Sequence, residues 1–272
     1  MTETNNADSF QVLEMGKPDE GVTSRMNRWC SASARRDFFE QRLQPCLAEL
    51  LGTAVFVCVG CVSGVRSVGV ADGIQSALAH GLALGVLILI FGPISGGHFN
   101  PAVSVSAYLC GGLELRLLPA YILAQLFGGV VGAGLAKAVS PPDLYTTSIG
   151  GAIRVDPSAL IALTVAEVIL TSFLTSVVCM GAINSQTRSI LAPFGIGLTV
   201  TAFDALALAF DVKLGAICGA CMNPARAFGP AIIAGHWDKH WVYWIGPVCG
   251  ALITAFHIRF LFGDRETRIV SK

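Results

Sequence analysis

Long apolar runs separated by short polar segments make up most of this sequence, from about residue 45 to about residue 262. Each run is close to the roughly 20 residues that a helix needs to cross the hydrocarbon core of a bilayer. Six such runs occur, at about 45–65, 73–92, 117–139, 159–183, 191–210 and 241–262. The pattern therefore predicts an all-α membrane protein with six transmembrane helices.

Two near-copies of one short motif lie outside these runs. The first reads GGHFNPAV over residues 96–103, and the second reads GACMNPAR over residues 219–226. Asn is favoured at a helix N-cap and Pro at the first helical position, so each Asn-Pro-Ala predicts a helix start. The helices that follow, at about 101–110 and 224–234, are too short to cross a bilayer and are expected to be re-entrant half-helices that face a shared site. The motif residues are Asn100, Pro101, Ala102, Asn223, Pro224 and Ala225.

The chain divides into two similar halves, at about 45–139 and 159–262, each with three apolar runs and one half-helix. Glu49 and Glu167 occupy equivalent places in the similar segments AELLGT and AEVILT. Three spans per half is an odd number, so the second half enters the membrane inverted. We therefore expect one channel domain at 45–262, between an N-terminal tail at 1–44, largely disordered, and a C-terminal tail at 263–272.

Composition agrees with a membrane protein and excludes other classes. Of the 272 residues, 53% are hydrophobic and only 13% are charged, against about 25% charged in soluble domains. The net charge is zero, so no nucleic-acid partner is expected. No nucleophile pair, phosphate loop or metal cluster stands out, which argues against an enzyme, a cofactor or a metal.

Basic residues near the ends of the spans predict the orientation. The N-terminal tail holds six Lys or Arg, and the other end carries Arg259, Arg265, Arg268 and Lys272. Six spans place both termini on one side, and an excess of Lys and Arg marks the cytoplasmic side. Both termini are therefore expected in the cytoplasm.

Paired Asn-Pro-Ala motifs in inverted halves, with Arg226 after the second, resemble the aquaporin family of major intrinsic proteins. The resemblance covers about residues 45–262. It implies a passive channel for water, with ammonia and hydrogen peroxide as further solutes, that assembles as a homotetramer in the lipid bilayer. The plasma membrane is the expected location, with the mitochondrial inner membrane as the alternative.

The resemblance also implies roles for single residues. The amides of Asn100 and Asn223, together with the positive ends of the two half-helices, would exclude protons and ions. His80, Ala220 and Arg226 match the outer selectivity filter of the family. The residue that the fifth span contributes to this filter is one of Phe203, Asp204 and Ala205, and the sequence leaves the choice open.

Three further residues are candidates for supporting roles. Cys221, two residues before Asn223, is expected to line the pore and to be the site of mercury inhibition. Glu49 and Glu167 are expected to accept hydrogen bonds from the N–H groups of the two re-entrant loops, because irregular backbone at membrane depth needs partners within the protein. A proton relay is the alternative role for these two carboxylates.

Two other functions stay open. A glycerol or small-solute facilitator is the nearer one, although members that pass glycerol usually carry Asp after the second Asn-Pro-Ala-Arg, where this chain has Ala227. A coupled transporter is the other, and only Glu49, Glu167 and Asp204 are placed to bind its coupling ion. A zinc-finger-like spacing from Cys218 to His240 also occurs, but the second Asn-Pro-Ala-Arg interrupts it.

Overall fold

The protein is described from a computed structural model, which covers residues 32–67, 74–155, 157–214, 220–265 and 268–269. The chain forms two units, residues 1–41 and residues 42–272. Most of the expected N-terminal tail, residues 1–31, lies outside the described residues. The described part of the first unit is the polar helix α2 (Ala32–Phe38), and a π-helical turn, η1 (Phe39–Leu43), lies at the boundary of the two units.

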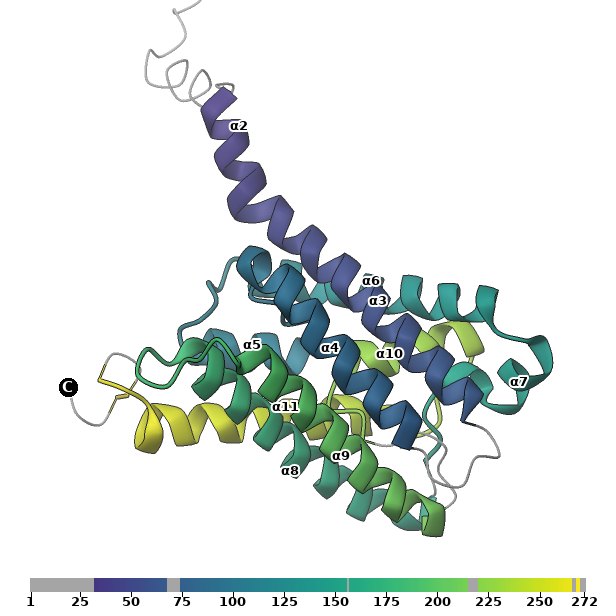
Figure 1. Ribbon diagram of the computed structural model, residues 1–272. Helices are drawn as coiled ribbons and strands as arrows, with labels where there is room; N and C mark the ends of the chain where they lie inside the picture. Colours follow the sequence, from purple (N-terminus) through teal and green to yellow (C-terminus); the bar gives the residue numbers. More distant parts are fainter. Residues whose placement is uncertain (1–31, 68–73, 156, 215–219, 266–267, 270–272) are drawn as a thin grey trace, which may run out of the picture. The chain divides into compact units, whose positions relative to one another are not determined.

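The described residues of the second unit include six long helices, each at the place of one predicted run (Figure 1). They are α3 (Gln44–Arg66), α4 (Ile74–Ser95), α6 (Leu118–Val139), α8 (Leu160–Val178), α9 (Ala192–Leu214) and α11 (Val242–His257). π-Helical turns extend α8 and α11, as η4 (Cys179–Ile183) and η5 (Ile258–Phe262). Short helices α7 (Pro142–Thr147), η2 (Ile149–Gly151) and η3 (Pro157–Ala159) connect the two halves.

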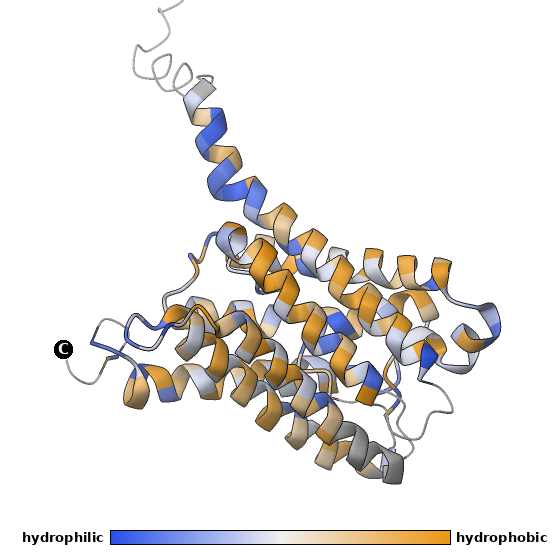
Figure 2. Cartoon of the chain, in the orientation of Figure 1, coloured by the Kyte–Doolittle hydropathy of each residue, from blue (hydrophilic) through white to orange (hydrophobic). Residues whose placement is uncertain are grey.

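The long helices are apolar on their outer faces as well as in the core (Figure 2). Large side chains such as Leu89, Phe127, Phe173 and Phe256 are more than half exposed. Within the described residues, five helices are long and apolar enough to cross a membrane, and a shorter apolar helix covers Ala192–Leu206 in α9. Apolar side chains exposed on the outside of a helical bundle are expected for a protein that is surrounded by lipid.

Two half-helices complete the fold, and each begins at an Asn-Pro-Ala motif. They are α5 (Pro101–Leu109) and α10 (Pro224–Ala234). The pairings of the two halves correspond: α3 packs on α6 as α8 packs on α11, and α10 packs on α6 as α5 packs on α11. The two central helices, α4 and α9, pack on each other. This exchange of half-helices between halves is the predicted inverted repeat.

Glycines allow the closest helix crossings. A Cβ at Gly197 on α9 would lie 2.5 Å from the carbonyl oxygen of Gly81 on α4. A Cβ at Gly250 on α11 would lie 2.6 Å from the carbonyl oxygen of Val168, the residue after Glu167. Gly128 meets the carbonyl oxygen of Leu50, the residue after Glu49, in the corresponding way. Small residues therefore set the distances between the helices that carry the site.

Candidate functional site

The two half-helices begin side by side, and each is capped by its own Asn. Asn100 and Asn223 both have extended backbone, and the Oδ1 atom of each accepts a hydrogen bond from the N–H two residues later, at 2.9 Å and 3.0 Å. The Nδ2 atom of Asn100 donates to the carbonyl oxygen of Met222 at 2.8 Å, and the Nδ2 atom of Asn223 donates to the carbonyl oxygen of Phe99 at 2.9 Å. Each cap thus binds the loop of the other half.

The residues that accept these bonds have an unusual backbone conformation. Phe99 has φ 49° and Met222 has φ 52°, a left-handed conformation that residues other than glycine rarely adopt. Both side chains are buried, with the Phe99 ring against Gly52, where a Cβ would overlap it. Strained backbone of this kind persists only where the surroundings hold it, and here it directs two carbonyl groups toward the opposite Asn.

Glu49 on α3 holds the first loop. Its Oε1 atom accepts hydrogen bonds from the Ser95 hydroxyl at 2.7 Å and from the His98 N–H at 2.9 Å. Its Oε2 atom accepts from the Phe99 N–H at 2.6 Å and from the Gln125 amide at 2.8 Å. The carboxylate is completely buried, and four donors offset the cost of removing it from water.

Glu167 on α8 binds the second loop in the same way. Its two oxygens accept from the N–H groups of Cys221 at 2.6 Å and Met222 at 2.7 Å. In both halves, the two N–H groups that the carboxylate binds immediately precede the capping Asn. The positions of Glu49 and Glu167 in the repeat therefore correspond in contacts as well as in sequence.

A polar network that the sequence did not reveal joins the first loop to α5 and α6. The Gln125 amide also donates to the Ser104 hydroxyl at 2.8 Å, and His98 Nδ1 lies 3.1 Å from the same hydroxyl. The Tyr121 hydroxyl donates to the carbonyl oxygen of Ser95 at 2.9 Å. The partners in this network come from segments far apart in the chain, so no local pattern of the sequence indicated it.

Arg226 and His80 are in contact on the side of the motifs where α10 meets η2. The Nε–H of Arg226 donates to His80 Nε2 at 3.3 Å, and its Nη1 donates to the carbonyl oxygen of Gly151 at 3.1 Å. Gly60 on α3 gives the imidazole room, because a Cβ there would overlap His80 Nε2. Ala220, the third predicted filter residue, is partly buried and packs against the main apolar cluster.

Asp204 on α9, one of the three candidates for the fifth-span filter residue, lies beside His80. Its Oδ2 atom lies 3.1 Å from His80 Nδ1, and the carbonyl oxygen of Ser76 lies at the same distance from that nitrogen. Asp204 is 5% exposed. Phe203, beside it, turns its ring to Phe173 on α8, with the ring centroids 6.0 Å apart.

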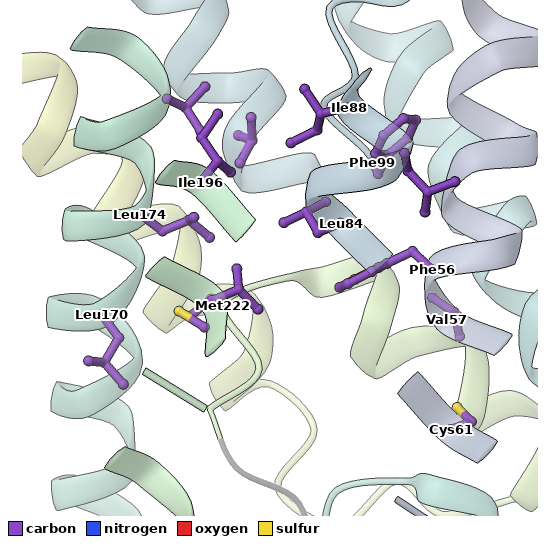
Figure 3. Packing of buried hydrophobic residues seen from close by; sticks show 14 of the residues in the cluster. Phe56, Val57, Cys61, Leu84, Ile88, Phe99, Leu170, Leu174, Ile196 and Met222 are labelled. Carbon is purple, nitrogen blue, oxygen red and sulfur yellow. The ribbon is translucent and has the colours of Figure 1, made fainter. Parts of the chain in front are cut away.

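A cavity of about 40 Å³ adjoins the two capping Asn residues. A cavity of this volume is large enough to hold water. Its polar lining includes His98, Asn100, Cys221 and Asn223. The rest of the wall is apolar, and Figure 3 shows part of it, with Leu84, Leu174, Ile196 and Met222 approaching one another from different elements.

Cys221 is buried at this cavity, and its Sγ atom donates to the carbonyl oxygen of Asn223 at 3.0 Å. Among the described residues, no group of three His, Cys, Asp or Glu side chains is arranged to hold a metal ion. Cys218, the first residue of the zinc-finger-like spacing, lies outside the described residues.

The comparisons with known proteins agree with this geometry. Residues 38–258 match the family model of the major intrinsic proteins. The chain is similar to aquaporin-8 of Mus musculus, with 46% identity over 96% of this chain and 97% of the relative, and to aquaporin-8 of Rattus norvegicus, with 47% identity over 86% and 88%. It is also similar to aquaporin TIP1-2 of Zea mays, with 37% identity over 79% and 85%.

The fold resembles the X-ray structure of the aquaglyceroporin from Plasmodium falciparum, with a TM-score of 0.64 and 23% identity over 79% of this chain and 94% of that chain. Aquaporins are channels and not enzymes. The chain therefore belongs to the major intrinsic protein family, the aquaporins, and is a multi-pass membrane protein that forms a passive channel for water and small neutral solutes.

Proposed function

We propose that this channel conducts water, ammonia and hydrogen peroxide past the paired Asn caps and excludes protons and ions. The observation that carries the proposal is the reciprocal binding of Asn100 and Asn223 to the opposite loops. An amide nitrogen carries two hydrogens, so one N–H of each Asn is used and the second is available to a solute. A water that accepts from both amides has its own hydrogens directed away from the midpoint, which breaks a proton wire.

The dipoles of α5 and α10 support the exclusion of cations. Both half-helices have their N-termini at the caps, and a helix N-terminus carries roughly half a positive charge. Arg226, which is 4% exposed and bonded to His80, adds a full positive charge. His80, Ala220 and Arg226 form the outer filter in this proposal, and Cys221 lies where a bound mercury ion blocks flow.

The size and lining of the cavity favour small solutes. A cavity of about 40 Å³ with a largely apolar wall suits molecules that need few hydrogen bonds at a time. Ammonia is similar in size to water, and hydrogen peroxide presents two oxygens in line. Glycerol is larger, and its uptake is the outcome that would support the facilitator function instead.

The contacts of the buried carboxylates disfavour coupled transport. Glu49 accepts four hydrogen bonds, and Glu167 accepts from two backbone N–H groups, so both act as fixed acceptors for the loops. A carboxylate held in this way has little freedom to bind and release a coupling ion. The support of the loops is therefore the role proposed for both residues.

The proposal extends to the assembly and the location of the protein. Residues 45–262 form the channel domain of a homotetramer with one pore in each subunit, and both termini are cytoplasmic. The plasma membrane is its location, with the mitochondrial inner membrane as the alternative. Light scattering of the protein in mild detergent measures its mass, and a monomeric mass would contradict the homotetramer. A protease added to sealed cells tests on which side the termini lie, and cleavage of the tails from outside would contradict the cytoplasmic termini.

Reconstituted vesicles test the solutes. Stopped-flow light scattering measures osmotic water flux, an internal pH dye measures ammonia entry, and an enclosed peroxide probe measures peroxide entry. We expect all three fluxes to exceed those of vesicles without protein, while glycerol uptake and proton conductance stay at the level of the empty vesicles. Water flux equal to that of empty vesicles would refute the proposal.

A further inference from the structure

Cys110 and Cys179 bring one thiol from each half of the repeat into contact. Cys110 is the C-cap residue of α5, and Cys179 is the first residue of the π-helical turn η4. Both are 1% exposed and belong to a small apolar cluster with Ala255 and Ile258. Their side chains are hydrogen-bonded to each other. Two free thiols thus touch although they are far apart in the chain.

Polar and charged neighbours distinguish this pair from ordinary buried cysteines. The side chain of Ser106 is hydrogen-bonded to Cys179, and the positive charge of Arg259 on η5 acts on Cys110. A positive charge near a thiol favours the thiolate, which is the form that reacts with oxidants. A single buried Cys in apolar surroundings is inert by comparison. The pair therefore combines a thiol that can ionise with a second thiol in contact with it.

The cavity beside the capping Asn residues extends to the elements that carry these thiols. Its wall includes Val103 on α5, Val178 at the end of α8 and Ala182 in η4. Val178 immediately precedes Cys179 in the chain. Cys179 also lies where α8 changes to a π-helical turn, and such turns are frequent at functional sites. A local opening of η4 gives a small solute in the cavity access to the two sulfur atoms.

We propose that Cys110 and Cys179 are a redox-active dithiol, which hydrogen peroxide in the cavity oxidises to a disulfide between the two halves of the channel. The inference rests on the proposed passage of hydrogen peroxide. Cys110 has the positive charge of Arg259 near it, so its thiolate is the group that attacks the peroxide.

The oxidation proceeds in two steps. The Cys110 thiolate attacks one peroxide oxygen and the O–O bond breaks, which leaves a sulfenic acid on Cys110. The hydroxide that departs takes up the proton that the thiol released and becomes water. The Cys179 sulfur then attacks the sulfenic sulfur, and its proton leaves with the hydroxyl group as a second water. Two thiols have lost two electrons and two protons, and one peroxide has become two waters.

The disulfide should stabilise the channel. It joins the end of α5 to η4 and closes a loop of about 70 residues, and a cross-link over a loop of this length restricts the unfolded chain. Because the two thiols already touch in the folded protein, the bond forms with little movement of the helices. The oxidised channel should therefore unfold at a higher temperature than the reduced channel.

The test uses the unmodified channel in reconstituted vesicles that enclose a peroxide probe. After peroxide is added, the protein is denatured, free thiols are alkylated with N-ethylmaleimide, and the peptides are mapped by mass spectrometry. We expect a disulfide-linked pair of peptides that contain Cys110 and Cys179, at least several-fold more abundant than without peroxide and lost after dithiothreitol. Peroxide entry without this linked pair would overturn the inference. A probe that reports no peroxide entry would refute the proposed passage of peroxide, and the inference with it, so the probe signal distinguishes the two failures.

Two variants separate the disulfide from other effects of peroxide. Cys249 on α11 is partly buried and lies outside the cluster of Cys110, so Cys249→Ser is the matched control. Peroxide should raise the unfolding temperature of the unmodified channel and of Cys249→Ser by roughly 5 °C or more, and dithiothreitol should reverse the rise. Cys110→Ser should show no rise. An equal rise in Cys110→Ser would show that the stabilisation has another source and would overturn the inference.

Discussion

Two buried carboxylates and two capping asparagines bind the backbone of the two loops that precede the half-helices. Glu49 and Glu167 accept hydrogen bonds from the N–H groups just before the capping Asn residues. The carbonyl groups of the same loops accept a hydrogen bond from the capping Asn of the other half. These N–H and carbonyl groups of the described loop residues thus have partners within the protein. Because these backbone groups are hydrogen-bonded within the protein, irregular backbone is tolerated at membrane depth.

Glu49→Gln tests the strength of this support. The amide keeps one acceptor oxygen and turns an N–H₂ group toward donors, so several hydrogen bonds to a charged group are lost. Each such bond contributes about 1.5–3 kcal/mol. We expect a loss of at least about 3 kcal/mol of stability, measured as a lower unfolding temperature in detergent, together with loss of water flux.

Glu114→Gln is the matched control for this change. Glu114 forms a surface ion pair with Arg42 at 3.1 Å, and its side chain is 67% exposed. An exposed pair contributes about 0–1 kcal/mol. A fall in unfolding temperature as large as that of Glu49→Gln would contradict the role of the buried site.

Gly60 offers a test of the position of His80. Since a Cβ at Gly60 overlaps His80 Nε2, Gly60→Ala should push the imidazole from its contact with Arg226 and lower water flux several-fold. His80→Ala should widen the filter and admit glycerol or urea. The double variant removes the overlap, so its fluxes should equal those of His80→Ala. If the water flux of Gly60→Ala equals that of the unmodified channel, the position of the His80 imidazole does not control water flux.

Cys221 is the expected site of mercury inhibition, because it is at the cavity beside both caps. Cys221→Ser should keep most of the water flux and lose its inhibition by mercuric chloride. Cys58→Ser on α3 is the control and should remain sensitive, since Cys58 is not part of the cavity lining. Inhibition that persists in Cys221→Ser would move the site elsewhere.

At the scale of elements, the crossing of α6 and α10 depends on two glycines. A Cβ at Gly129 would lie 2.5 Å from the carbonyl oxygen of Ala225, and a Cβ at Gly229 would overlap Gly129. We expect Gly229→Ala to force the helices apart and to cost about 1–3 kcal/mol, as overpacking does. Thermal unfolding in detergent measures the change.

Gly134→Ala, also on α6, controls for the general effect of replacing glycine in a helix. Nothing lies within 4 Å of a Cβ at Gly134. Alanine is favoured over glycine in a helix by roughly 0.5–1 kcal/mol, so this variant should be unchanged or more stable. Equal destabilisation of the two variants would show that the crossing is not the cause.

The elements themselves could be predicted from sequence, because their signals are local. Runs of apolar residues indicated the long helices, and Asn-Pro-Ala placed the starts of α5 and α10 at Pro101 and Pro224. The contacts of Asp204 with His80 and of Arg226 with Gly151 could not be predicted. They depend on how α4, α9, α10 and η2 pack, and no spacing along the chain encodes that packing.

At the scale of the whole molecule, membership of the family means that this protein is a passive channel. Flux should therefore follow the gradient of the solute alone. We expect water and ammonia fluxes in reconstituted vesicles to be the same with and without a sodium gradient, and with and without a proton gradient at constant ammonia concentration. A flux that runs against its own gradient when either ion gradient is imposed would indicate coupled transport.

The reciprocal capping of the two halves has a consequence for biosynthesis. The amide of Asn100 and its partner carbonyl at Met222 are 122 residues apart in the chain. At roughly 5–20 residues per second, a ribosome needs on the order of ten seconds to cover that distance. Until the second half has been synthesised, the amide of Asn100 therefore lacks the carbonyl group of Met222 as its partner, and the pore cannot be completed.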